Sequence, residues 1–401
     1  MPKLDLSRVP VIHVGSTKNL REKKKITEKA PGVLWFEFTD DYSVFDYGKM
    51  PDRIPNKGAA AAMMSAFLFE EIASPRTWKK FIAEGILDTI KDKALGYELA
   101  ASPVLKSLAD YGFPTHYQGI VNHAGSAVRL KELKSPSNIL QVAAVRIIPP
   151  APVVIGGRRL YNYGATTQNM TNHLVPLECV FRFGVPKGSS LLGRLESMPG
   201  YAEELGLKKV KEGALLSRPV VELFSKLEPS DRFLPFEYAM NLAGLSGSEF
   251  VTLLHATLLV ALWLRERFAA IDIKLLDGKF EFLRLAGSLA LGDAVTPDEL
   301  RLTFKNLQIS KEPLRQYHHL YQPKFVEAMK KSKKIAQTMD RELRDIVADL
   351  GAPPKPLPGE MIGAISDMYA GITERLLGRD IFGGRATLAN ITARLKKLGV
   401  A

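Results

Sequence analysis

The chain has 401 residues, of which 46% are hydrophobic and 24% charged, the composition of an ordinary soluble globular protein with room for two domains or one domain with large insertions. Its formal net charge of +12 favours anionic partners, but nucleic acid, a membrane surface and phosphorylated metabolites all satisfy that condition. The single cysteine, Cys179, excludes an internal disulfide framework, and "MPKLDLSRVP" lacks a signal-peptide pattern, so we expect a cytoplasmic protein.

The N-terminal region predicts antiparallel β structure, because the short apolar pieces "VIHVG" and "VLWFEF" occur between about Val11 and Phe38. The segment "VGSTKNL" looks like half of a glycine-rich phosphate loop, although it is neither a Walker A nor a full GxGxxG pattern. The basic run "REKKK" lacks interleaved aromatic residues and is interpreted as a solvated turn. The next stretch, "TDDYSVFDYGKMPDRIPNKG", predicts a long loop of the kind that often carries function.

The rest of the chain predicts an α+β protein. A helical pattern runs from Ala59 to about Leu108, and a second β region follows from roughly His116 to Phe183. The apolar run "FVTLLHATLLVALWLRERF" is shorter than the roughly twenty residues that span a bilayer, and it predicts a buried helix. Beyond the 274–302 stretch the tail is mostly helical.

The paired prolines of "RIIPPAPVV" indicate a domain boundary. We therefore expect an antiparallel β domain with a helical insertion and the nucleotide loop in residues 1–148. A larger α+β domain, with the metal and substrate site and the helical tail, would occupy residues 149–401.

Alternation in "VPLECVFRFGVPKGSS" puts Glu178 and Arg182 on one face of a strand and Cys179 on the other, where it is interpreted as a core thiol rather than a nucleophile. The Gly/Ser loop that follows, with Ser189, suits a phosphate or carboxylate through its amides and hydroxyls. Many such loops bind nothing, so this signal is weak alone.

The segment "KLLDGKFEFLR" alternates charged and apolar residues, so that Asp277, Lys279 and Glu281 share one face of a strand. One face is suited to a core and the other to ionic chemistry. By itself the segment favours the simpler interpretation, an edge strand with a solvated polar face.

A hairpin after this strand, with Ala286 and Gly287 as its turn, brings Asp293 opposite Glu281 or one residue away from it. Two like charges there are destabilising unless they are neutralised, and Mg²⁺ is typically held by one or two carboxylates together with phosphate oxygens. The pattern therefore fits a nucleotide–metal site. The alternative is a register shifted by one residue, which places Asp293 on the other face.

The sequence "TPDEL" predicts a helix start with Thr296 as N-cap, Pro297 at the first helical position and Glu299 closing a capping box. This explanation is structural. It leaves Asp298 and Arg301 as the functional candidates of the segment.

Taken together and in order, these segments resemble the SAICAR synthetase (phosphoribosylaminoimidazole-succinocarboxamide synthase) family. "GSTKNL" is similar to its Gly-Lys-x-Lys nucleotide loop, "DDYSVFDYG…NKG" to its Asp-x-Ser/Thr-x-x-Asp-Gly…Lys-Gly segment, and "VPLECVFRF…GSS" to its Pro-x-Glu-x-x-x-Arg…Gly-Ser block. "RPVVELFSKLEPSD" resembles its Pro-x-x-Glu-x-x-x-Lys…Asp segment, and "LLDGKFEF…LGDAVTPDELRL" its Asp-x-Lys-x-Glu-Phe…Asp-Glu-x-x-x-Pro-Asp-x-x-Arg signature. Each block alone is a weak signal, but five such blocks in the same order are specific to this family.

The resemblance has gaps, chiefly at about 77–174 and beyond residue 305, so the chain looks like an elongated variant with helical insertions. Three positions depart from the pattern. Ser16 stands where the family has its first loop lysine, Ala294 replaces the Glu of Asp-Glu, and Leu283 replaces the Gly after Glu-Phe.

The resemblance implies a two-domain, ATP-grasp-like α+β fold and ATP-dependent ligation of L-aspartate to carboxyaminoimidazole ribotide (CAIR), which gives SAICAR, ADP and phosphate in purine biosynthesis. ATP and Mg²⁺ are the expected cofactors, no nucleic acid or membrane partner is expected, and a homo-oligomer is left open. The alternatives are another Mg²⁺-ATP-dependent kinase or ligase and, less favoured, a basic RNA-binding protein, in which acidic groups at a phosphate-tracking surface would oppose binding.

The resemblance also implies residue roles. The metal ligands would be Glu281 and Asp293. The groups at the reacting centre would be Lys279, Asp277 and Arg301. Those around ATP would be Lys18, Gly15, Glu178 and Lys226. Those that hold substrate or shape the cleft wall would be Arg182, Ser189, Asp41, Asp46, Lys57 and Asp298.

Overall fold

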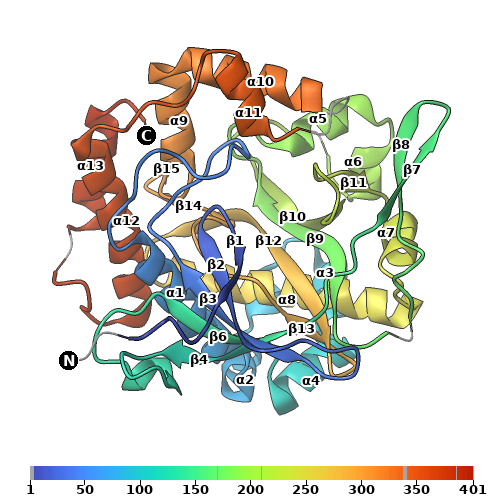
Figure 1. Cartoon of the computed structure of the whole chain (residues 1–401). Helices are drawn as coiled ribbons and strands as arrows, with labels where there is room; N and C mark the ends of the chain where they lie inside the picture. The colour runs from blue at the N-terminus through green and yellow to red at the C-terminus, as the bar shows by residue number, and fades with distance from the viewer. Residues whose placement is uncertain (1–3, 169, 209, 337–340, 385, 401) are drawn as a thin grey trace.

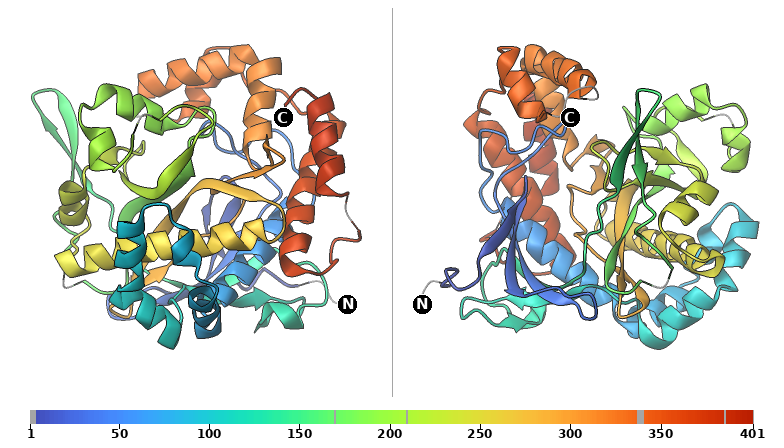
Figure 2. Two further views of the ribbon diagram at one scale, coloured as in Figure 1. Left: turned by 180° about the vertical axis from the view of Figure 1, so that it is seen from behind. Right: turned by 45° about the vertical axis from the view of Figure 1, so that its right-hand side comes forward.

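The computed structural model describes residues 4–168, 170–208, 210–336, 341–384 and 386–400. Helices and antiparallel sheets make up this part of the chain, which confirms the α+β class (Figure 1). Two large sheets carry the architecture. Figure 2 (right) shows the first sheet with the tail helices on one side of the molecule and the second sheet with the longest helix on the other.

The first sheet has the strand order β1-β2-β3-β6-β4-β5. Its strands are β1 (Val11–Val14), β2 (Lys18–Lys24), β3 (Gly32–Phe38), β4 (Tyr117–Val121), β5 (Ala127–Val128) and β6 (Ile139–Ala144). The antiparallel N-terminal prediction is confirmed. The solvated turn predicted for "REKKK" is wrong, because Arg21 pairs with Trp35 within β2 and only the end of the run leaves the strand.

The second sheet has the order β11-β10-β9-β12-β14-β15, and β13 also pairs with β12. Its strands are β9 (His173–Gly184), β10 (Leu215–Ser225), β11 (Phe233–Leu234), β12 (Lys274–Leu285), β13 (Ser288–Leu291), β14 (Leu300–Phe304) and β15 (Leu307–Gln308). The predicted hairpin is confirmed, since Leu285 pairs with Ser288 around the Ala286–Gly287 turn. The edge-strand interpretation is wrong: β12 lies between β9 and β14, and both of its faces are largely buried.

The apolar face of the second sheet forms part of the main core. The rings of Phe181 in β9 and Phe280 in β12 have centroids 4.7 Å apart. Helix α8 (Gly247–Ala269) packs against β9, β10 and β12. Cys179 is fully buried here and burial raises its pKa, so the core-thiol interpretation is confirmed.

Helix α8 is the apolar run that the sequence predicts as a buried helix. By length and composition it is also the one helix in the described part of the chain that would be able to cross a membrane. Because 61% of its apolar stretch is buried inside the molecule, it has the environment of a core helix.

The predicted helical regions are confirmed as several short helices. The insertion contains α1 (Lys57–Ile72), α2 (Pro75–Ala83), η1 (Ile86–Thr89), α3 (Lys93–Ala100) and α4 (Pro103–Tyr111), and a short turn of helix, η2 (Leu130–Glu132), follows later. The middle of the chain adds α5 (Ser190–Ser197), α6 (Tyr201–Glu204) and α7 (Phe236–Leu242). The tail forms α9 (Glu312–Tyr321), α10 (Pro323–Ala336), α11 (Leu343–Asp349), α12 (Gly359–Leu377) and α13 (Leu388–Lys397).

The strands of the first sheet all precede residue 149 and those of the second all follow it. Between them, β7 (Ala151–Ile155) and β8 (Arg158–Asn162) form a separate hairpin that projects from the body (Figure 1). The tail returns to the first half of the chain, because α12 packs along α1. The domain division at 148/149 stays a prediction.

The helix predicted at "TPDEL" is wrong. The amide of Leu300 donates to the Thr296 carbonyl (3.0 Å), and the amide of Asp298 donates to the Thr296 hydroxyl (3.1 Å), so the segment makes one turn. Strand β14 begins directly afterwards, and Arg301 pairs with Asp277 of β12. Pairing with a distant strand therefore overrides a local capping signal.

Candidate functional site

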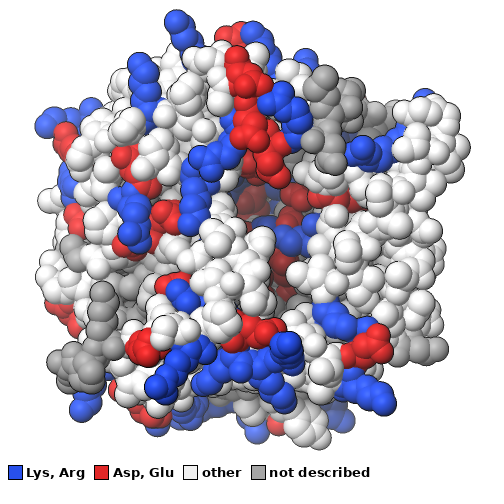
Figure 3. Space-filling view, in the orientation of Figure 1, with Lys and Arg blue, Asp and Glu red and all other residues white. Residues whose placement is uncertain are grey.

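The polar face of the second sheet lies under a hollow. Figure 3 shows this hollow near the centre of the molecule, with acidic and basic side chains gathered inside it, where Figure 1 draws β10 and β12. Alternation places Glu178 and Arg182 of β9 and Asp277, Lys279 and Glu281 of β12 on this side, opposite the face that packs on α8. Arg284, near the end of β12, instead pairs with Glu249 of α8.

One group of charges, which we call the ion-pair cluster, centres on two opposed carboxylates. Its members are Lys18, Glu178, Lys226, Lys279, Glu281, Asp293 and Glu299. The residue directly across from Glu281 is Glu178 of β9. Two like charges at this spacing need a counter-charge, and Lys226 supplies it: its ammonium lies 2.9 Å from Glu178 and 2.7 Å from Glu281.

Lys279 is the second counter-charge. Its ammonium lies 2.7 Å from Glu178, 3.5 Å from Glu281 and 3.3 Å from Glu299. Burial lowers the pKa of Lys279, but the carboxylates of Glu299, Glu281 and Glu178 outweigh this effect and raise it. Lys279 therefore keeps its charge while it is largely withdrawn from water.

Lys18 joins the first sheet to this cluster. It lies at the start of β2 and forms an ion pair with Asp293, which follows β13 in a left-handed backbone conformation (φ 56°). Burial lowers the pKa of Lys18 to about 8, against the pull of Glu281 and Glu299. Asp293 does not face Glu281 directly, since the amide of Gly292 donates to the Glu281 carbonyl. The hairpin therefore has the one-residue offset, and the directly opposed Glu281–Asp293 pair on which the metal prediction rested does not form, because Glu178 lies across from Glu281.

A second group of charges on the same sheet face, which we call the arginine cluster, centres on Arg182. Its Nε donates to Glu222 (2.6 Å) and its Nη1 to Asp277 (3.0 Å). Arg301 lies 3.4 Å from the same Asp277 carboxylate, and Ser189 accepts a long bond (3.5 Å) from Arg182. Burial raises the pKa of Asp277, although Arg301 and Arg182 act in the opposite direction.

Glu222 anchors this cluster from β10. Its side chain is fully buried and accepts from Arg182, from two nitrogens of Arg194 (both 2.7 Å) and from the hydroxyl of Tyr201 (2.8 Å). Burial raises the pKa of Glu222, and the two arginines more than compensate and lower it. A charged, fully bonded carboxylate thus fixes the plane of the Arg182 guanidinium.

Lys57 and Asp298 form a third, buried contact beside the ion-pair cluster. The Lys57 ammonium lies 2.7 Å from Asp298 and 5.1 Å from the ring centroid of Tyr369, whose hydroxyl also donates to Asp298. Lys57 is 1% exposed, so it cannot reach a ligand in the hollow. Burial alone would raise the pKa of Asp298, but nearby groups, Lys57 first among them, lower it below its ordinary value.

The remaining predicted site residues lie in loops outside the two charged clusters. Gly15 closes the β1–β2 turn, where a side chain would meet the Lys18 carbonyl at 2.7 Å. Asp41 pairs within its own loop, with Lys49 (3.0 Å), and the exposed Asp46 pairs with Lys333 of α10. The structure thus brings the β9, β10, β12 and β14 residues together with Lys18 and leaves these loop residues outside the two clusters.

Several residues of the site carry no predicted role, among them Glu222, Asp231, Glu299 and Tyr369. Glu222 and Asp231 lie within the quoted "RPVVELFSKLEPSD" segment, so a signal existed, whereas the capping-box interpretation concealed Glu299. Asp231 is exposed, yet loss of hydration around its carboxyl and the nearby Glu178 raise its pKa to about 6. No sequence signal points to Tyr369, because its partners are distant in the chain.

Comparison with known proteins gives consistent matches. A family model described as SAICAR synthetase matches residues 21–332. A protein of Archaeoglobus fulgidus named as a phosphoribosylaminoimidazole-succinocarboxamide synthase is 32% identical over 388 residues, which is 96% of this chain and 99% of that protein. The corresponding protein of Thermoplasma volcanium is 23% identical, over 86% of this chain and 94% of its own length.

The fold is also similar to that of a solved structure. The SAICAR synthase of Saccharomyces cerevisiae, solved in complex with SAICAR, superimposes with a TM-score of 0.50 at 19% identity, over 96% of this chain and 99% of that one. Helices α11, α12 and α13, and with them Tyr369, lie beyond the residues that the family model matches.

The depressed pKa of Lys18 predicts a pH dependence of stability. Between about pH 8 and the ordinary value of 10.5, the folded protein binds fewer protons at Lys18 than the unfolded chain does, so stability rises with pH across this window relative to a protein without Lys18. We expect the urea midpoint of the wild type, measured relative to that of Lys18→Met, to rise as the pH increases from 8 to 10.5.

The matched control is Lys24→Met, at the exposed end of the same strand. Its midpoint should follow that of the wild type throughout. Parallel curves for wild type and Lys18→Met would show that the Lys18 pKa is not depressed.

Proposed function

The chain belongs to the SAICAR synthetase family, and from this premise we propose how its two charged clusters perform the family's reaction. The protein joins the amine of L-aspartate to the carboxylate of CAIR, with ATP converted to ADP and phosphate, in purine biosynthesis. The observation that carries our assignment is the opposed pair Glu178–Glu281, held by Lys226 and Lys279 within the hollow.

The ion-pair cluster would bind the phosphates of ATP through Lys18, Lys226 and Lys279. Among the described residues, no group of three or more His, Cys, Asp or Glu side chains is placed to hold a metal ion. Glu281 and Asp293 supply hard oxygen atoms, which fit Mg²⁺, and phosphate oxygens and water would complete its shell. The ion would neutralise phosphate charge during transfer.

The arginine cluster would hold the ribotide. Arg182 presents a guanidinium fixed by Glu222, and Arg301 lies beside it, so two planar donors meet one anionic group. Ser189, at the start of α5, adds a hydroxyl and a helix N-terminus. Asp277 accepts from both arginines and would act as a positioning residue.

Lys57 and Asp298 would hold the wall of the cleft rather than touch a substrate, because they are buried and satisfy each other. Asp41 and Asp46 would shape the loop above it, and Gly15 would let the β1–β2 turn close near the phosphates. Glu178 would orient the lysines that meet ATP.

The chemistry has two steps. A carboxylate oxygen of CAIR attacks the γ-phosphorus of ATP, the bond to the ADP oxygen breaks, and an acyl phosphate forms. The amine of aspartate then attacks the acyl carbon, the carbon–oxygen bond breaks, phosphate leaves and the nitrogen loses a proton. Lys279, kept charged by three carboxylates, would stabilise the negative charge that develops on the transferring phosphoryl group.

Release of ADP by the purified protein tests this function. We expect ADP only when CAIR and aspartate are both present, together with Mg²⁺-ATP. ADP formed with CAIR alone at the full rate would indicate a kinase, and ADP formed without CAIR would remove the assignment of the arginine cluster.

Arg182→Lys should harm use of the ribotide more than binding of ATP. Lysine keeps the charge but loses the bidentate fork, so the KM for CAIR should rise at least tenfold, about 1.4 kcal/mol, while ATP affinity by calorimetry stays near normal. The control is Arg232→Lys, because the exposed Arg232 pairs with Glu228 outside the two charged clusters. A collapse of ATP affinity would place the nucleotide, not the ribotide, at Arg182.

Lys279→Met should act on the chemical step. Loss of a cation that interacts most strongly in the transition state should lower kcat of the folded protein a hundredfold or more, whereas loss of a counter-charge for Glu178 and Glu281 alone would lower the melting temperature and leave that kcat near wild type. Lys274→Met, at the exposed start of the same strand, is the matched control. A kcat within a few-fold of wild type would show that Lys279 only neutralises Glu178 and Glu281.

A further inference from the structure

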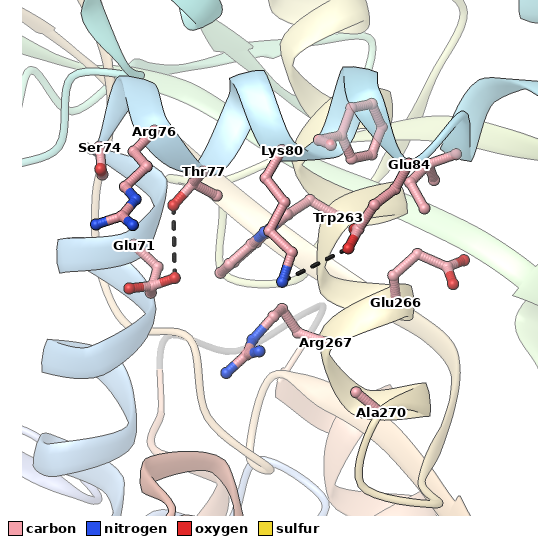
Figure 4. A pocket seen from close by; sticks show the side chains of 12 residues that line it. Glu71, Ser74, Arg76, Thr77, Lys80, Glu84, Trp263, Glu266, Arg267 and Ala270 are labelled. Carbon is pink, nitrogen blue, oxygen red and sulfur yellow. Dashed lines mark hydrogen bonds and ion pairs between the residues drawn. The ribbon is translucent and has the colours of Figure 1, made fainter.

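A second cavity lies on the far side of the second sheet from the hollow. It has a volume of about 360 Å³ and is lined by the end of α1, by α2 and by the last turns of α8. Figure 4 shows Thr77 and Lys80 of α2 and Arg267 of α8 pointing toward the space between these helices. The size falls within the range of about 300–1,000 Å³ for small-molecule sites. Because α8 covers the apolar sheet face, this cavity is separate from both charged clusters.

The carboxylates of the cavity already have partners. The pairs are Glu84 with Lys80 (3.5 Å), Glu71 with Thr77 (3.4 Å) and Glu266 with Arg265 (2.8 Å). Two of these acids therefore face a cation, while Glu71 accepts its bond from a neutral hydroxyl. With Arg265 counted beside Arg76, Lys80 and Arg267, four cations surround three acids, which leaves an excess of one positive charge.

The arginines of the cavity are not matched in this way. In residues 4–168, 170–208, 210–336, 341–384 and 386–400, neither Arg76 nor Arg267 forms an ion pair. Arg267 is held over the ring of Phe67 (5.3 Å), and its buried Nε has no hydrogen-bond partner among these residues. The Nε is withdrawn from solvent, so an oxyanion in the cavity would meet the terminal nitrogens of the Arg267 guanidinium, which Figure 4 shows directed into the space, and would accept charge-assisted bonds from them.

A second part of the cavity wall is apolar. Phe81, Ile86 and Trp263 are buried and contribute ring and methyl surface to the lining. A bare inorganic ion would leave this wall unused. A ligand with an anionic group at one end and a planar or apolar body at the other uses both walls.

We propose that this cavity binds a small organic oxyanion, a phosphate or carboxylate carried on a planar or apolar body. Arg267 receives the oxyanion, Lys80 and Arg76 add positive charge at the mouth, and Trp263 with Phe81 contacts the body. The site is distinct from the ligase site. The cavity is nevertheless close to the ligase site in sequence. Ala270 lines the cavity, and β12, which carries Lys279, starts four residues later at Lys274.

The experiment uses phenyl phosphate as the probe and calorimetry on the full chain. Phenyl phosphate should bind wild type at submillimolar concentration and Arg267→Gln at least tenfold more weakly, about 1.4 kcal/mol. Arg159→Gln is the control, since Arg159 is exposed on β8 and does not line the cavity. Its affinity should stay within twofold of wild type. Inorganic phosphate and phenol should each bind more weakly than phenyl phosphate.

Equal affinity of wild type and Arg267→Gln would overturn the proposal, because the probe would then occupy the ligase site. No heat at millimolar probe would overturn it too. Should Arg267→Gln fail to fold, Lys80→Gln, whose side chain is 70% exposed, must weaken the probe at least threefold for the proposal to stand. ADP release from ATP in the presence of CAIR and aspartate is measured separately. The test of the ligase assignment and the test of this cavity can therefore fail independently of each other.

Discussion

The opposed carboxylates of Glu178 and Glu281 set the constraint on which the site depends. Strand pairing forces the two acids together on a largely buried face, where they repel each other unless cations stand between them. Lys279 comes from β12 itself, and Lys226 directly follows β10. The charge balance of the site therefore depends on the register of these three strands, since a shift in register would separate the acids from their lysines.

The pleat of β12 also separates the two chemical tasks. Asp277, Lys279 and Glu281 follow one another at two-residue intervals, about 6.6 Å apart along the strand. Asp277 faces the arginines, Glu281 faces the lysines, and Lys279 lies between them. Under the proposed function, one strand would hold the residues that bind the phosphoryl acceptor and those that bind its donor at a fixed spacing, which is what positioning for phosphoryl transfer requires.

Local pattern predicted the parts of the site that local geometry controls. Alternation in β12 predicted its charged face, and the Ala286–Gly287 turn predicted the hairpin but left Asp293 either opposite Glu281 or one residue away. Local pattern did not predict which residues long-range strand pairing would bring together. The alternation cannot tell an edge strand from a central one, and the capping signal at Thr296 gave way to pairing between β14 and β12. Tyr369 is the extreme case, because it meets Asp298 from a tail helix 71 residues away.

Lys18 is the one member of the ion-pair cluster that comes from the first sheet, and its contact with Asp293 crosses from that sheet to the second. Any widening of the gap between the sheets pulls this pair apart and leaves Asp293 to be neutralised by dissolved cations. The Lys18 ammonium would regain water in the same motion, and its basicity would return toward that of a free lysine. Movement of the two sheets is thus coupled to proton uptake and to ionic strength, with a single side chain as the link.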